Sequence, residues 1–128
     1  MRMILNGGRG NGNQILKPET VALMSRNAMG SLRVRMLPTQ NLVLTRDAEF
    51  FPGIPKTWGL SFMINEETAP TGRSAGSLAW AGLANTYFWI DPKKNIAALI
   101  MMQVLPFVDA RSLALFTAYE RAVYDSLA

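Results

Sequence analysis

Residues 76–103 most restrict the fold of this chain, because three segments of strand character follow one another with only short turns between them. The first two, residues 76–82 and 85–92, are rich in aromatic and β-branched side chains. The third, residues 96–103, is almost continuously apolar, which is typical of a strand covered on both faces. A strand-like segment at residues 58–64 precedes them, so the sequence predicts an antiparallel sheet of about four strands.

Helical patterns lie on both sides of these strands. Pro18 and Glu19 are suited to the first turn of a helix that is expected to end at Gly30. Asp109 can cap a final helix. The buried stripe of that helix is predicted to consist of Leu115, Phe116, Tyr119, Ala122 and Val123. We therefore expect an α+β fold in which an antiparallel sheet packs against helices, with residues 1–128 forming a single domain.

Two other segments lack a persistent pattern. Residues 1–5 are followed by Asn6 and two glycines, which is typical of the end of a helix. One helical turn is not stable alone, so the chain is expected to begin inside a longer element. Residues 31–57 contain several prolines and predict an extended loop, with one short strand at residues 41–45.

The composition excludes several kinds of chemistry. The 128 residues include neither Cys nor His, so no disulfide, thiolate nucleophile or imidazole base is available. The pattern also predicts no metal site and no cofactor. Hydrophobic residues make up 49% of the chain and charged residues 17%, which is typical of a chain that folds.

The charge pattern gives little indication of a macromolecular partner. The net charge is +4, but the basic residues are scattered along the chain, whereas nucleic-acid binding favours a concentrated basic face. The longest apolar run, residues 96–102, is far shorter than the roughly 20 residues of a membrane helix. We therefore expect neither nucleic-acid binding nor a membrane span. Residues 1–5 are too short for a secretory signal, and the sequence does not assign a compartment.

Short motifs that resemble catalytic signatures have simpler explanations. Residues 72–76 match Gly-Xaa-Ser-Xaa-Gly, but a strand follows instead of a helix and the chain has no His, so they predict a turn. Lys56 and Thr57 are followed by Trp58 and not by Gly, so we interpret them as coincidental. The carboxylate pairs are interpreted as exposed acidic turns, and they are Asp47 with Glu49 and Glu66 with Glu67.

The order and spacing of the last strands carry a resemblance to a known family. Trp80, Ala81 and Gly82 lie on the first strand of residues 76–103, and residues 16–24 also match a segment common in the same proteins. Nearly the whole chain resembles the C-terminal part of the penicillin-recognising serine hydrolases, in the branch of class C β-lactamase-like proteins and family VIII carboxylesterases. In that superfamily a Lys-Thr-Gly triad lines the active site, and in the esterase-like branch Trp-Xaa-Gly can replace it.

The resemblance implies a role for four residues in substrate binding. Trp80, Ala81 and Gly82 would form one wall of an acyl site, and the N–H of Leu83 would point at the developing oxyanion. Gly82 would let the substrate approach the backbone. Trp80 in place of Lys would favour esters or other apolar acyl groups over a β-lactam carboxylate.

The resemblance also implies what is missing. The Ser-Xaa-Xaa-Lys signature of the superfamily does not occur in these residues, and none of the three tyrosines matches its second motif. We therefore expect the C-terminal portion of a hydrolase that acts on esters or β-lactams, with no catalytic residue of its own and no activity alone. Its partners would be a further copy of the chain, the missing N-terminal half, or a small apolar ester. The alternative is a non-enzymatic module that self-associates or binds a small ligand.

Overall fold

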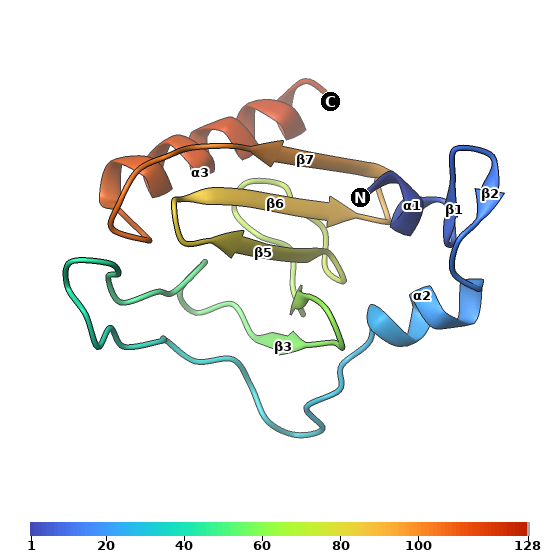
Figure 1. Cartoon of the computed structure of the whole chain (residues 1–128), viewed down its shortest axis with the longest axis horizontal. Helices are drawn as coiled ribbons and strands as arrows, with labels where there is room; N and C mark the ends of the chain where they lie inside the picture. The colour runs from blue at the N-terminus through green and yellow to red at the C-terminus, as the bar shows by residue number, and fades with distance from the viewer. Residues whose placement is uncertain (128) are drawn as a thin grey trace.

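A five-stranded antiparallel sheet lies at the centre of the computed structural model, which describes residues 1–127 (Figure 1). The strands follow one another in chain order, and they are β3 (Lys56–Trp58), β4 (Met63–Asn65), β5 (Leu78–Gly82), β6 (Thr86–Asp91) and β7 (Ile96–Ile100). The prediction of an α+β fold with an antiparallel sheet is confirmed. The sheet has one strand more than expected.

The prediction of one strand at residues 58–64 is wrong, because this segment contains the turn between two strands. The chain reverses there, since the Gly59 N–H donates to the Phe62 carbonyl at 2.8 Å, and β3 and β4 form a hairpin. Gly59 also lies against Met24, the last residue of helix α2 (Pro18–Met24). A Cβ at this position would meet the Met24 carbonyl oxygen at 2.2 Å, so only glycine fits the turn.

Helix α3 (Ala110–Asp125) covers one face of the sheet. Asp109 caps it as predicted, because its side chain accepts hydrogen bonds from the N–H groups of Arg111 and Ser112. The predicted buried stripe is wrong in part, since Leu115 is 54% exposed and Ala122 is also exposed. The fully or nearly fully buried positions are Ser112, Phe116, Glu120 and Tyr124.

Two short helices pack against the opposite face. Helices α1 (Arg2–Leu5) and α2 (Pro18–Met24) pack there on Ile64, Leu78 and Ile90. A small hairpin of β1 (Arg9–Gly10) and β2 (Asn13–Gln14) lies between them in the sequence.

Helix α2 is shorter than predicted and does not reach Gly30. The side chain of Asn27 donates to the Gly30 carbonyl and accepts from the Met29 N–H, so a local turn replaces further helical hydrogen bonds. The predicted strand at residues 41–45 is also wrong, because that segment is a turn. The long loop itself is present. Two isolated β-bridges hold this loop in place. One pairs Leu37 with Ala48 within the loop, and the other pairs Thr45 with Phe107.

Strand β7 departs from its predicted burial. It has β6 as its only neighbour in the described sheet, and Leu99 is 40% exposed. Met101, just after the strand, is 76% exposed. The apolar run at residues 96–102 is therefore not covered on both faces here. None of the helices in residues 1–127 is long and apolar enough to span a membrane.

Candidate substrate-binding site

A notch interrupts the sheet beside β5. Strand β4 pairs with β5 only through Met63 with Ala79 and Ile64 with Leu78. Beyond this point Trp80, Ala81 and Gly82 are paired with β6 on one side, and no described strand pairs with their other side. The backbone of the predicted triad therefore presents an open strand edge, a surface that can accept a further hydrogen-bonding partner.

Aromatic side chains fix the Trp80 indole at this notch. Trp58, from β3, packs edge-to-face on Trp80 with ring centroids 4.5 Å apart. Phe50, from the long loop, packs on the same indole with centroids 6.2 Å apart. Edge-to-face pairs of this kind are each worth about 0.5–1.5 kcal/mol beyond the area that they bury. The indole is thus an apolar wall, and the closer of its two ring contacts is the one with Trp58.

The four predicted site residues lie together at the open edge. Trp80, Ala81 and Gly82 end β5, and Leu83 follows in the turn with 53% of its surface exposed. A Cβ on Gly82 would meet no heavy atom closer than 3.7 Å, so the described chain itself does not require glycine there. Space for a ligand therefore remains beside the Gly82 backbone, and the role of the four residues in binding stays a prediction.

Asn85 holds the turn that carries Leu83, and sequence reasoning missed it. Its buried side chain donates to the carbonyls of Val104 and Pro106 at 2.8 Å each, and its Oδ1 accepts from the Val108 N–H at 2.9 Å. The Tyr87 hydroxyl donates to the same oxygen at 2.5 Å. Burial raises the pKa of Tyr87 to about 12, so the phenol remains a hydrogen-bond donor at neutral pH. The sequence did contain one indication of this role, because Asn85 lies between two strand-like segments, where asparagine is typical of a turn.

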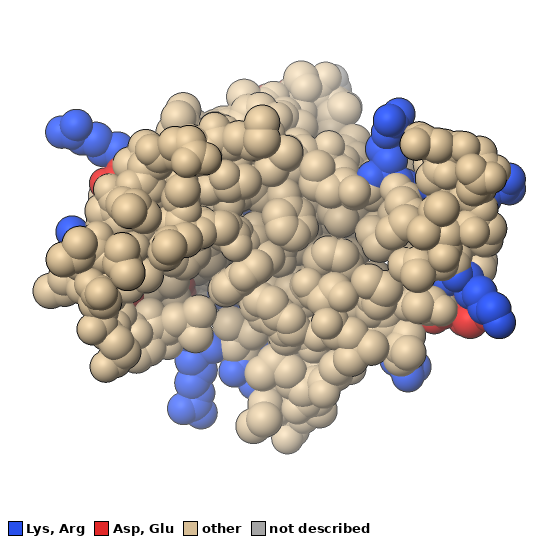
Figure 2. Space-filling view, in the orientation of Figure 1, with Lys and Arg blue, Asp and Glu red and all other residues tan. Residues whose placement is uncertain are grey.

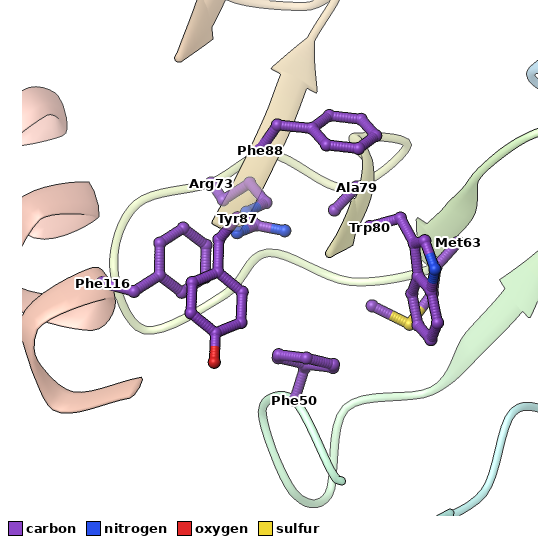
Figure 3. A pocket seen from close by; sticks show the side chains of 8 residues that line it. All are labelled: Phe50, Met63, Arg73, Ala79, Trp80, Tyr87, Phe88 and Phe116. Carbon is purple, nitrogen blue, oxygen red and sulfur yellow. The ribbon is translucent and has the colours of Figure 1, made fainter. Parts of the chain in front are cut away.

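A narrow aromatic cavity lies beneath Trp80 (Figure 3). It is almost filled by its own side chains, with a free volume of about 10 Å³, and the residues that line it are Phe50, Met63, Arg73, Ala79, Trp80, Tyr87, Phe88 and Phe116. The only charged side chain among them is Arg73, which forms an ion pair with the buried Glu120 of α3. The cavity therefore offers no free charge to a ligand.

Ser74 and Lys56, from the two motifs that resemble catalytic signatures, form hydrogen bonds within the fold. Residues 72–76 form a turn before β5, as the sequence predicted. Ser74 is buried in it, and its N–H donates to Asp91. The Lys56 amine is buried and donates to the carbonyls of Phe51 and Ile54. Burial lowers the pKa of Lys56, although the nearby Glu49 carboxylate acts in the opposite direction.

The prediction on the acidic pairs has a structural outcome. The carboxylates interpreted as exposed acidic turns are exposed, and they are Asp47, Glu49, Glu66 and Glu67. Residues 1–127 contain no cluster of three or more acidic side chains that could hold a metal ion.

The chain belongs to the β-lactamase family, because the family model for β-lactamase matches residues 10–120. The predicted membership in the penicillin-recognising superfamily is therefore confirmed. The search of the curated proteins found no match.

Solved structures show the same fold in longer chains. Unliganded simvastatin synthase (LovD) from Aspergillus terreus superimposes with a TM-score of 0.72 and 24% identity, over 97% of this chain and 32% of that one. The LovD9 mutant of that enzyme gives a TM-score of 0.72 and 23% identity, over 98% and 32%. A penicillin-binding protein homologue from Caulobacter crescentus gives 0.59 and 21%, over 94% and 29%. The chain thus spans about a third of the length of each.

Proposed function

We propose that this chain forms one wall of the substrate site of a β-lactamase-like serine hydrolase that acts on neutral esters. The observation that carries the proposal is the open β5 edge at Trp80, Ala81 and Gly82, which ends at the exposed Leu83. A catalytic Ser and Lys of the family type would have to come from polypeptide outside these 128 residues.

The geometry supports a division of roles within the wall. The acyl group of the ester lies along the β5 edge, where the Gly82 backbone leaves room for it. The Leu83 N–H donates to the carbonyl oxygen as that oxygen becomes negative during attack by the serine hydroxyl. The alcohol then leaves, and water releases the acid from the acyl-enzyme. Trp80 favours a neutral acyl group, because an apolar indole stands here in place of the Lys of the family triad.

The face of the molecule in Figure 2 has a largely uncharged centre, in keeping with a neutral substrate. Figure 2 shows Lys and Arg side chains mostly around the rim of the displayed face, with few over its centre. Among solved structures with this fold, one is named a simvastatin synthase and another a penicillin-binding protein homologue. The names of these relatives differ, so the fold alone does not choose the acyl group, and Trp80 is the residue that supports the neutral ester.

The absence of activity in the isolated chain is the first expected result. Purified protein should hydrolyse p-nitrophenyl butyrate no faster than buffer, since an activated nucleophile is lacking. A colorimetric assay at neutral pH measures this directly. Turnover that disappears on changing a single serine, such as Ser74→Ala, would show a catalytic site that the proposal does not include.

Binding of the ester tests the wall itself. Titration with methyl butyrate, followed by the amide signals in nitrogen-15 NMR spectra, should shift the Gly82 and Leu83 signals most. Leu83→Pro removes the N–H and should weaken binding, whereas Leu83→Ala keeps it and serves as the matched control. Equal binding by the two variants would contradict a role for this N–H.

The exposed edge of β7 favours self-association as a second candidate function. Leu99 and Met101 give this edge an apolar surface without a partner in the described sheet, and such edges tend to pair with another chain. Light scattering should therefore give at least the mass of a dimer. Leu99→Lys should shift the mass toward that of a monomer. Val43→Lys, in the long loop where Val43 is 77% exposed, should have no effect. A wild-type monomer would contradict the prediction.

A further inference from the structure

Two cavities meet at the side chains of Phe50 and Phe116. The first is the aromatic cavity beneath Trp80. The second is an open cleft between residues 49–52 and α3, with a volume of about 240 Å³. Phe50 and Phe116 line both of them, so the two cavities are neighbours that share these side chains. Figure 3 shows Phe50 projecting from the loop into the space between Tyr87 and Trp80.

Of the two rings, Phe50 is the less tightly packed. Phe116 lies in the middle of α3 and stacks on Tyr87 with ring centroids 4.6 Å apart. Phe50 is only partly buried, and its contacts with Trp80, Tyr87 and Phe107 have centroid separations of 6.0–6.5 Å.

The backbone beside Phe50 is also in an unusual conformation. Phe51 has a φ of 49°, a left-handed value that costs energy for a side chain of this size. The strain is held locally, because the carbonyl of Phe51 accepts hydrogen bonds from the Ile54 N–H and the Lys56 amine. The loop thus holds Phe50 in a position that an alternative backbone conformation would release.

The lining fixes the chemistry of a ligand. The deep cavity is walled by aromatic rings, Met63 and Ala79. Its guanidinium, on Arg73, is bound to Glu120 and lies over the rings of Phe51 and Phe116. The cleft adds Pro52, Leu113 and Thr117, and its only charged lining residue is Glu49, which disfavours an anion.

We propose that the cleft and the cavity form one binding site for a small, neutral, apolar ligand, and that the Phe50 ring is the gate between them. The ligand enters from the cleft, displaces Phe50 and places an aromatic ring or short alkyl chain under Trp80. In the closed state Phe50 occupies the position that the ligand takes. The apparent affinity is therefore the intrinsic affinity multiplied by the fraction of molecules in which the gate is open.

This site goes beyond the proposed wall function. It lies under Trp80 and toward α3, whereas the ester is proposed to lie along the open β5 edge. Its test measures equilibrium binding of a compound that has no ester group. The gate can therefore fail while the wall function stands, and the converse also holds.

Calorimetric titration of the full chain with toluene tests the gate. Phe50→Ala removes the competing ring and should bind toluene about tenfold more tightly than wild type. Ala79→Leu fills the deep cavity and should weaken toluene binding at least tenfold. Val43→Ala is the control for an exposed loop substitution. Phe50→Leu, a smaller change, replaces Phe50→Ala if circular dichroism shows that the alanine variant is unfolded.

The outcomes separate the proposal from simpler binding. Tighter binding by the Phe50 variant, together with weaker binding by Ala79→Leu, supports a gated deep site. Binding that is unchanged in both variants would place toluene at the surface and overturn the proposal. Benzoate binding as tight as that of toluene would overturn the assigned ligand chemistry, because an anion should be excluded by Glu49 and by the absence of a free cation.

Discussion

Replacing Glu120 with alanine should destabilise the protein by about 3–5 kcal/mol, the usual cost of leaving one partner of a buried ion pair without the other. Glu120 is fully buried on α3 and receives hydrogen bonds from Arg73 and Thr71, which precede β5. Loss of the carboxylate leaves the Arg73 guanidinium charged and 1% exposed among aromatic rings. The same contact ties α3 to the turn that leads into the candidate site.

Urea denaturation followed by circular dichroism measures this effect. Glu67→Ala, an exposed carboxylate, is the matched control and should change the unfolding free energy by less than about 0.5 kcal/mol. The double variant Arg73→Met with Glu120→Leu should recover most of the loss, because an apolar pair of similar volume can replace a buried ion pair. A small loss for Glu120→Ala alone would show that water reaches Arg73 and that the pair is not sealed.

The sheet was largely predictable from sequence, and its hairpin was not. Aromatic and β-branched patterns predict β5, β6 and β7 because these strands are long and follow one another with short turns. The segment at residues 58–64 carries a strand pattern on both sides of Gly59. The reversal there depends on the approach of the Met24 carbonyl, a contact between residues 35 positions apart. A local pattern cannot contain such a contact.

Helix α3 shows a second limit of pattern reading. An apolar stripe predicts that Leu115 and Ala122 are buried, since charged residues are rarely buried without a partner. Glu120 is buried instead because Arg73 lies opposite it, 47 positions earlier in the chain. The pairing partner comes from the turn before β5, so the helix sequence alone gives the buried face only in part.

The residues of the candidate site could be predicted from the sequence, but the shape of their surroundings could not. Trp80, Ala81, Gly82 and Leu83 are consecutive, so the resemblance to a known motif was enough to select them. The notch exists because β4 is short, and the indole is fixed by Trp58 and Phe50 from distant segments. The role of Asn85 likewise depends on carbonyls about 20 residues later in the chain.

Asp91 should give the protein an acid-sensitive stability that a single amide substitution removes. Burial raises the pKa of Asp91, but hydrogen bonds from the N–H groups of Ser74 and Lys94 and from the Tyr124 hydroxyl outweigh it, so the pKa lies below its usual value. Burial and the Asp91 carboxylate in turn raise the pKa of Tyr124, so its hydroxyl remains protonated and donates.

The direction of the pH dependence follows from these contacts. A carboxyl group whose pKa is lower in the folded than in the unfolded state stabilises the fold fully above its unfolded pKa of about 3.9. That stabilisation is lost as the pH falls through the lower, folded value. Asp91→Asn cannot be ionised, so it should lower the unfolding free energy by about 1–3 kcal/mol at pH 7. The difference from wild type should stay constant between about pH 5 and 8 and shrink below about pH 4.

Urea denaturation of wild type and Asp91→Asn at several pH values tests both the size and the shape of this effect. Glu67→Gln removes an exposed carboxylate and should leave the acid profile unchanged. A difference that does not shrink in acid would mean that the ionised form of Asp91 is not favoured in the folded state. Because Asp91 joins the end of β6 to the turn before β5 and to α3, its protonation should also loosen the strand that presents Trp80. Acid should therefore broaden the Trp80 indole signal in wild type before global unfolding, and it should not do so further in Asp91→Asn.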